Sequence, residues 1–213
     1  RRSSDRVTLL SKKDASKVTL PFTKTDDNLV KATGGPFGDM KMSAKNVNLL
    51  CKKGDEVYVN EVTADVIYRV ESNHALTPVV ERTPSYQDAS GQDFFLMLTG
   101  ANARYYFFKR QQALLEFQGN AASDTKSTYV AYDRKEKQLL NPTFTNEDYP
   151  SQDIPMSKLL QCAGSANRCY LQLEAFKLKE ALAEGKLKGT LKSIAEKLDE
   201  EDNPVLMVVE FKK

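Results

Sequence analysis

Histidine and cysteine are scarce in this 213-residue sequence, which contains one His and three Cys. Every catalytic scheme that pairs a nucleophile with a histidine base would have to use His74, which stands in a polar stretch typical of a surface turn. A structural zinc site would need Cys162 and Cys169 as well, but these lie further apart than the short spacing of such sites. The sequence therefore predicts no catalytic residue, no metal and no cofactor.

Long apolar runs and an excess of charge are also missing. The longest apolar run covers only residues 205–209, too short for a helix that spans a membrane. Lys and Arg number 31 and Asp and Glu number 29, a formal net charge of +2. So balanced a charge gives no basis for binding nucleic acid or an anionic membrane surface. We expect a globular chain without a transmembrane segment and without a nucleic-acid partner.

Much of the sequence shows the residue pattern of β-strands. Apolar and polar residues alternate in many short segments that are rich in β-branched and aromatic side chains. The expected strands cover residues 7–10, 17–22, 46–53, 56–62, 66–71, 76–83, 94–99, 104–111, 128–133, 138–140, 158–162, 169–173 and 205–211. Short connections favour antiparallel pairing of neighbouring strands, so the strands within 46–83 and those within 94–140 should form two meanders.

Four-stranded sets begin near residues 46 and 94, and a third set near 158 has its middle replaced by a helical stretch. The starts imply a repeat of about 50 residues, which is typical of β-propeller blades. We expect an all-β fold of about three and a half blades in a single domain. The expected parts are a partial blade at 1–45, blades at 46–84 and 94–141, and a blade with a helical insert at 158–213. A β-sandwich is the alternative. The last strand should be paired within a sheet, with the N-terminal strands as candidate partners.

The helical insert covers residues 175–199 and should be broken at Gly185 and Gly189. Its apolar stripe comprises Leu191, Ile194 and Leu198, spaced three and four residues apart. Thr190 is the expected N-cap of the second piece. The aromatic run at 105–108 alternates between two faces of a strand, so we expect it in the core.

Several segments resemble a known family. They read GDEVYVNE at 54–61, DVIYRV at 65–70, LTPVV at 76–80 and EDNPVLMVV at 201–209, with a short helix at 171–182 before the last strand. In this order they resemble a blade and the closing strand of the six-bladed β-propeller proteins of unknown function from gut-type Gram-negative bacteria. The resemblance covers residues 47–213, most of the chain.

The resemblance implies export to the periplasm or the outer cell surface, with a lipid anchor on a preceding segment. Six blades need about 300 residues. The chain is therefore expected to be either the C-terminal half of a longer propeller or a shortened relative that closes by other means. The family carries no activity that can be transferred to named residues.

The remaining candidates for ligand binding are residues in the expected loops. Carboxylates in the expected connections stand beside aromatic and amide groups, a combination suited to holding a sugar. The candidate ligand-binding residues are Tyr86, Asp88, Asp93, Tyr149, Gln152 and Asp153. We expect a non-catalytic module that binds carbohydrate or a protein partner. One alternative is a glycan-active hydrolase or lyase that uses paired loop carboxylates. The other is an assembly module that self-associates through exposed blade edges.

The cysteines leave two interpretations open. Cys162 and Cys169 flank a short loop, so in an oxidising compartment a hairpin would bring them together as a disulfide. They are otherwise small buried hydrophobic residues. Cys51 lies in an alternating strand and is expected in the core.

Overall fold

The computed structural model describes residues 6–23, 29–33, 38, 40–43, 50–53, 55–86, 94–112, 114–118, 121–122, 127–160 and 168–211. The chain forms two compact units, Arg1–Thr99 with Phe108–Thr128, and Gly100–Phe107 with Tyr129–Lys213. Over the described residues the fold is mostly β, its sheets are largely antiparallel, and none of the sheets they form closes on itself. No helix in the described part of the chain has the length and apolar character needed to cross a bilayer.

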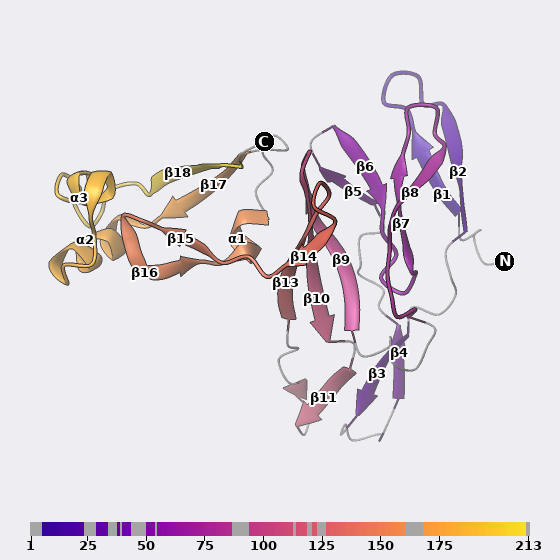
Figure 1. The fold of residues 1–213 in the computed structure, drawn as a ribbon, viewed down its shortest axis with the longest axis horizontal. Coiled ribbons are helices and arrows are strands. Elements are labelled where there is room, and N and C mark those ends of the chain that lie inside the picture. The colour runs from indigo at the N-terminus through magenta and orange to yellow at the C-terminus, as the bar shows by residue number, and fades with distance from the viewer. Residues whose placement is uncertain are drawn as a thin grey trace. The chain divides into compact units, whose positions relative to one another are not determined.

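The first unit contains the meander expected between residues 46 and 83 (Figure 1). Its strands are β5 (Leu50–Lys53), β6 (Glu56–Val59), β7 (Val66–Val70) and β8 (Leu76–Glu81), paired antiparallel in that order. β1 (Arg6–Leu10) and β2 (Lys17–Thr23) form the expected hairpin, and β2 contacts β8. Val, Ile and Tyr dominate β6 and β7, which suits a half-buried pleated surface.

The second expected set of four strands also forms one sheet, in the order β14-β13-β10-β9. These strands are β9 (Phe94–Ala101), β10 (Tyr105–Gln112), β13 (Ser127–Asp133) and β14 (Gln138–Leu140). The predicted burial of the aromatic run is confirmed for Tyr106, Phe107 and Phe108, while Tyr105 is partly buried.

A third four-stranded sheet was not expected from the sequence. It has the order β12-β11-β3-β4 and contains β3 (Leu29–Thr33), β4 (Met40–Ser43), β11 (Leu114–Gln118) and β12 (Ala121–Ala122). β11 pairs parallel with β3, for example Leu114 opposite Lys31. These strands are short and two of them pair across about 80 residues, so local alternation and turn signals carry little information about them.

The second unit contains, besides parts of the β14-β13-β10-β9 sheet, two hairpins and the helices α1, α2 and α3. β15 (Phe144–Asn146) pairs with β16 (Tyr149–Ile154), and β17 (Arg168–Leu173) pairs with β18 (Val205–Glu210). The C-terminal strand is therefore not paired with the N-terminal strands, because its partner is β17 and β1 and β2 form a sheet of their own. The hairpin at 144–154 was also missed, and it stands where the sequence indicated only connections.

The strand predicted at 158–162 is wrong for its described residues, which end helix α1 (Met156–Leu160). The carbonyl of Pro155 accepts hydrogen bonds from the N–H groups of Lys158 and Leu159, at 2.9 and 3.3 Å, and so begins the helical turn. Met156 and Leu159 are buried three residues apart, which is a helical spacing and not the alternation of a strand.

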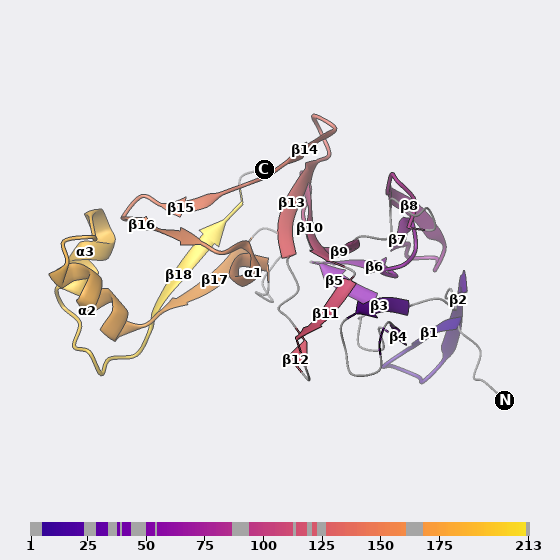
Figure 2. The ribbon, with the colours of Figure 1, turned by 90° about the horizontal axis from the view of Figure 1, so that it is seen from below.

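The helical insert forms as α2 (Ala175–Ala183) and α3 (Gly189–Ala195), which lie together beside one end of the β17–β18 hairpin (Figure 2). The predicted break at Gly185 is confirmed. Gly185 has φ +68° and donates to the carbonyl of Leu182, while Lys186 donates to that of Ala181. This bonding pattern is a Schellman motif, which favours glycine at the left-handed position.

The predicted N-cap is wrong, because Lys188 and not Thr190 occupies that position and its side chain makes no capping bond. The predicted apolar stripe holds for Leu191 and Leu198, which pack in one cluster with Leu178 and Leu187 of the insert. Val205 and Leu173, from the start of β18 and the end of β17, complete the contact between the helices and the hairpin.

The β17–β18 hairpin has two different faces. One face packs Cys169 and Leu171 against Leu159 of α1. The opposite face leaves large apolar side chains exposed, namely Tyr170, Leu206 and Val208.

Candidate functional site

The connection from β6 to β7, residues 60–65, contains an unusual number of buried polar side chains. Asn60, Glu61 and Thr63 are all at most 5% exposed. The carbonyl of Glu61 accepts a hydrogen bond from the N–H of Ala64 at 3.1 Å, which folds the connection into a tight turn. Buried polar groups in a loop need hydrogen-bond partners, and the residues at the two ends of this connection bond to neighbouring segments.

Asn60 attaches the beginning of the connection to β9. Its Oδ1 accepts the N–H of Leu98 at 2.6 Å, and its Nδ2 donates to the carbonyl of Leu96 at 3.4 Å. Main-chain groups of β9 are thus satisfied by one side chain, which fixes the connection against that strand.

Asp65 attaches the other end of the connection to the segment after β8. Its Oδ1 accepts the N–H of Tyr86 at 2.6 Å, and its Oδ2 accepts the hydroxyl of Ser85 at 2.5 Å. The main-chain carbonyl of Asp65 also accepts the N–H of Arg82 at 2.9 Å. Both ends of the connection are thus anchored by side-chain hydrogen bonds to neighbouring segments.

Arg82 packs behind Asp65 in a largely apolar setting. Its guanidinium lies over the rings of Phe94 and Tyr86, at 4.7 and 5.5 Å from their centroids, and its Nε donates to the carbonyl of Pro84. Burial lowers the pKa of Arg82, and the negative charge of Asp65 acts in the opposite direction. Burial also raises the pKa of Tyr86, whose ring stacks on Phe95 at 5.7 Å.

A groove of about 740 Å³ lies beside this anchored connection and runs along one face of β7; we call it the β7 groove. Its polar end is formed by Glu61, Thr63 and Asp65. On β7 the lining residues are Val66, next to the polar end, and Tyr68, so the strand advances about 7 Å along the groove at ~3.3 Å per residue. The acidic groups are gathered at the start of β7.

Aromatic and apolar side chains line the rest of the β7 groove. Phe22 of β2 and Tyr68 of β7 meet edge to face with their ring centroids 6.2 Å apart. Ala75 and Leu76 line the far end, where Leu76 stands opposite Val70 in the sheet. The groove thus combines carboxylates, a hydroxyl and an aromatic pair in one open cavity.

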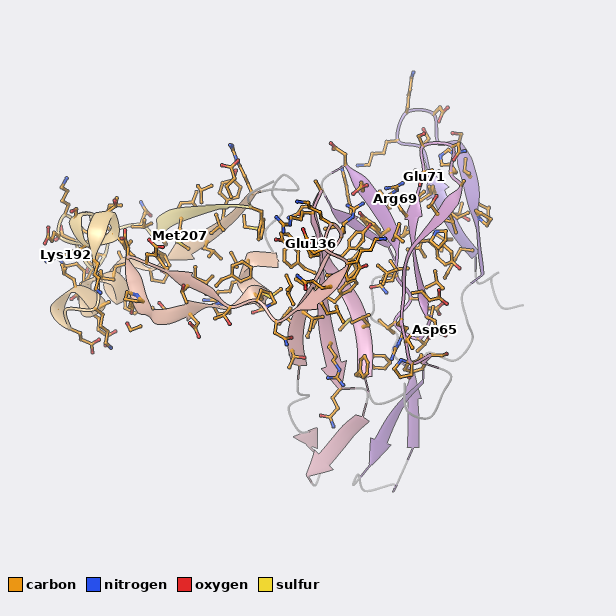
Figure 3. All side chains as sticks on the ribbon, viewed as in Figure 1. Asp65, Arg69, Glu71, Glu136, Lys192 and Met207 are labelled. Carbon is orange, nitrogen blue, oxygen red and sulfur yellow. The ribbon has the colours of Figure 1, made fainter. Side chains whose placement is uncertain are left out.

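The cationic residue of β7 faces away from this groove. Val66 and Tyr68 line the groove, so alternation directs Arg69 to the opposite face of the sheet. There its guanidinium forms ion pairs with Glu71 at 2.9 Å and with Glu56 at 3.3 Å. Figure 3 shows Asp65 at one end of β7 and Arg69 with Glu71 at the other.

Tyr86, the first candidate from the sequence, lies in the first unit and is buried beside Val62 and Phe95. Its backbone is held by Asp65 and its ring is packed in the core, so its described contacts are structural. Asp88 and Asp93, which were expected to act with it, lie outside the described residues.

Tyr149, Gln152 and Asp153 belong to the second unit, on strand β16. Tyr149 packs against the helical cluster, and Gln152 and Asp153 are exposed. The structure therefore brings these three onto one strand, and Tyr86 belongs to the other unit, so their role in ligand binding stays a prediction.

The β15–β16 turn explains how the second helix of the insert is capped. Oδ2 of Asp148 accepts the N–H of Leu191 at 3.0 Å, and the main-chain carbonyl of Asp148 accepts the N–H of Lys188 at 2.8 Å. A Cβ on Gly189, which has φ +50°, would come within 2.8 Å of Cγ of Asp148 and still closer to its Oδ1. Glycine is required there both for its backbone conformation and for space.

The expected disulfide remains a prediction, because Cys162 lies outside the described residues while Cys169 is buried in β17. His74 is exposed in the β7–β8 turn with φ +65°. In the part of the chain that the structure describes, no group of three or more His, Cys, Asp or Glu is placed to hold a metal ion.

The residues that form the β7 groove were not predicted from the sequence. Glu61 and Asp65 were interpreted as strand and turn positions, although four polar residues within the six of residues 60–65 were a usable signal. Phe22 and Tyr68 are 46 residues apart and meet through long-range packing of β2 on the sheet of β7 and β8, which no local pattern indicates.

Comparison with known proteins gives little further information. No family model and no curated protein matches the chain. One similar solved structure is that of a "putative exported protein" from Bacteroides fragilis, with 15% sequence identity and a TM-score of 0.43, covering 99% of this chain and 72% of that one. A TM-score of this size does not establish a common fold, so the likeness assigns the chain neither a family nor a function.

Proposed function

We propose that the chain is a non-catalytic carbohydrate-binding module and that the β7 groove is its binding site. The observation that carries this proposal is the combination in one open cavity of the Phe22–Tyr68 pair with Glu61, Thr63 and Asp65. Ligand sites in proteins are concave, mostly apolar and equipped with a few convergent polar groups, and this groove has those properties.

Each part of the groove has a counterpart in a sugar. The apolar C–H face of a pyranose ring packs on an aromatic side chain, which the Phe22–Tyr68 pair supplies. Sugar hydroxyls donate to carboxylates and exchange hydrogen bonds with a threonine hydroxyl, and both groups stand at the polar end. The anchors at Asn60 and Asp65 hold the polar end in shape before binding, which lowers the entropic cost of binding.

The loop residues expected from the sequence stay part of the proposal. Asp88 and Asp93 lie between Tyr86 and β9, close in sequence to the anchored segment, and we propose them as further ligand contacts. Tyr149, Gln152 and Asp153 would form a separate contact surface on β16, where Gln152 and Asp153 are exposed.

We also propose that the two consecutive antiparallel sheets, β5 to β8 and β9 with β10, β13 and β14, are propeller blades. Their four-stranded order and the link from Asn60 to β9 support this. Action in the periplasm or at the outer cell surface, with a lipid anchor on a preceding segment, rests on the sequence resemblance alone.

The test is calorimetric titration of the full chain with a panel of neutral and charged oligosaccharides. For the sugars that bind, Tyr68→Ala and Phe22→Ala should each weaken binding about tenfold, which is about 1.4 kcal/mol. Tyr170→Ala is the matched control, because Tyr170 is an exposed aromatic on β17 outside the groove. No binding to any saccharide, or equal losses in the control, would overturn the proposal.

The same preparations test the two other functions considered. Release of reducing ends from the bound sugars, lost on substitution of a loop carboxylate, would identify a hydrolase or lyase. A dimer that persists on dilution in light scattering would identify an assembly module.

A further inference from the structure

We propose that the guanidinium of Arg110, packed on the ring of Phe94, binds the carboxylate of a monoanionic ligand. This binding site goes beyond the proposed function, because Arg110 and Phe94 are not among the described residues that line the β7 groove. The juxtaposition that carries it is one aromatic ring with two guanidinium groups against it. Their carbons lie 4.7 Å (Arg82) and 4.1 Å (Arg110) from the centroid of the ring.

Neighbouring elements of the first unit bring these side chains together. Arg82 follows β8, Phe94 begins β9, and Arg110 lies near the end of β10. β9 and β10 are adjacent strands of one sheet, so the ring and the guanidinium of Arg110 are both carried by paired strands. A binding group on regular secondary structure is held more precisely than one on a loop.

Arg82 supports the ring and is itself committed to the protein. It is 8% exposed, and its Nε and Nη1 donate to the carbonyls of Pro84 at 3.2 Å and of Phe94 at 3.3 Å. One of these bonds thus reaches the main chain of Phe94 while the guanidinium lies over its ring. Arg82 therefore fixes the ring on which Arg110 packs.

Arg110 has its edge available to a ligand. It is exposed, and among the described residues no carboxylate lies within ion-pair distance of its guanidinium. The exposed Arg168, in contrast, already pairs with Glu210 at 3.4 Å. A guanidinium that packs on a ring can still use the N–H groups along its edge, and two of these match the two oxygens of a carboxylate.

The local charge suits a ligand with one negative charge. Burial is the main cause that lowers the pKa of Arg82, the charge of Asp65 raises this pKa, and the charge of Arg110 lowers it further. The two guanidinium groups therefore repel each other across the ring. An anion on Arg110 would reduce this repulsion, and a single charge suffices because Asp65 already offsets Arg82.

The experiment titrates the full, isotope-labelled chain with sodium glucuronate at low salt. NMR follows the Nε–H resonances of the arginines, a readout that detects the weak binding expected at an exposed site. We expect the resonance of Arg110 to shift to saturation. The methyl ester of glucuronate, which lacks the charge, should bind at least tenfold more weakly. The shift should shrink at 0.5 M salt because exposed charge interactions are screened.

Variants assign the binding to one side chain, with the backbone resonances of β9 and β10 as the readout. Arg110→Gln should weaken glucuronate binding at least tenfold. Arg110→Lys keeps the charge but loses the paired donors, so it should restore only part of the affinity. Arg168→Gln is the matched control, because it removes an exposed arginine that already has an ion-pair partner. This control and Tyr68→Ala, in the β7 groove, should leave glucuronate binding unchanged.

Several outcomes would overturn the proposal. Equal affinity for glucuronate and its methyl ester excludes a carboxylate site, and an equal loss in Arg168→Gln or Tyr68→Ala excludes a site at Arg110. Inorganic phosphate that binds more tightly than glucuronate would overturn the choice of a monoanion. Because the ester changes the ligand and not the protein, the test stays decisive even if Arg110→Gln fails to fold. The proposed function is tested separately, by the binding of oligosaccharides to the Phe22 and Tyr68 variants.

Discussion

Asp65 in the first unit and Asp148 in the second each anchor a distant segment by a hydrogen bond, but in different surroundings. Each stands in a connection between strands, and each carboxylate accepts a main-chain N–H from a distant segment, that of Tyr86 at 2.6 Å and that of Leu191 at 3.0 Å. Against Asp148 the helix closes tightly, with Gly189 in direct contact. Beside Asp65 a groove stays open. An acidic loop residue therefore indicates an anchored segment as readily as a ligand site, and the space next to it distinguishes the two.

The largest expected effect on stability comes from removing the Asp65 anchor. Asp65→Ala should lower the free energy of unfolding by about 3 kcal/mol, because two hydrogen bonds to a charged group are lost and the N–H of Tyr86 loses its acceptor. Asp148→Ala should cost about 1 kcal/mol, the usual value of a helix cap. Urea unfolding measures both.

Asp65→Asn is the control for that comparison, because it keeps one acceptor oxygen and should lose much less stability than Asp65→Ala. If Asp148→Ala proved as costly as Asp65→Ala, the two anchors would not differ as described.

A smaller effect is expected at the glycine that contacts Asp148. Gly189→Ala should cost about 2 kcal/mol, since alanine is strained at positive φ and its Cβ would displace the capping carboxylate. Gly185→Ala is the matched variant. Its φ is +68° but its Cβ would meet nothing within 4 Å, so only the backbone strain of about 1 kcal/mol remains. Equal losses in the two variants, measured by thermal unfolding, would show that the contact with Asp148 is unimportant.

The smallest effect concerns acid stability at a third aspartate that serves as an anchor. Asp133 accepts hydrogen bonds from Arg104 and from the N–H groups of Lys135 and Glu136, and the bond from Arg104 is the main cause that lowers its pKa below 3.8. Its pKa is lower in the folded chain than in the unfolded one. The stabilisation is therefore complete above about pH 4 and is lost as the pH falls through the lowered value.

Urea unfolding of the wild type and of Asp133→Asn at several pH values tests this. The difference in stability between the two should be constant at neutral pH and should shrink steadily as the pH falls below about 4. A difference that does not change with pH would contradict the assignment.

Predictions from the sequence succeeded where structure is determined by near neighbours. The strands of the two four-stranded sheets follow from alternation, with short turns throughout the first sheet, and Gly185 ends α2 as its position predicted. The predictions failed where contacts between distant segments determine the structure. The pairing of Leu114 with Lys31 in β11 and β3, and the capping of α3 by Asp148, depend on residues far apart in the sequence.

The candidate site was even harder to predict from the sequence, because it too depends on contacts between distant segments. Glu61 lies in a connection whose polar residues were visible in the sequence, but the groove exists only because Phe22 is brought against Tyr68 by the packing of the β1–β2 hairpin. Burial of Glu61 was equally unpredictable, since loop carboxylates are normally solvated.

The side chain of Asn60 has a consequence for how such a fold tolerates mutation. Its amide supplies one acceptor and one donor to main-chain groups of β9, as the peptide group of a paired strand would. Aspartate at this position would turn an acceptor toward the carbonyl of Leu96, and leucine would offer neither group. Either change would therefore loosen the first meander from the strand that follows it, although the substitution lies in a connection and not in a strand.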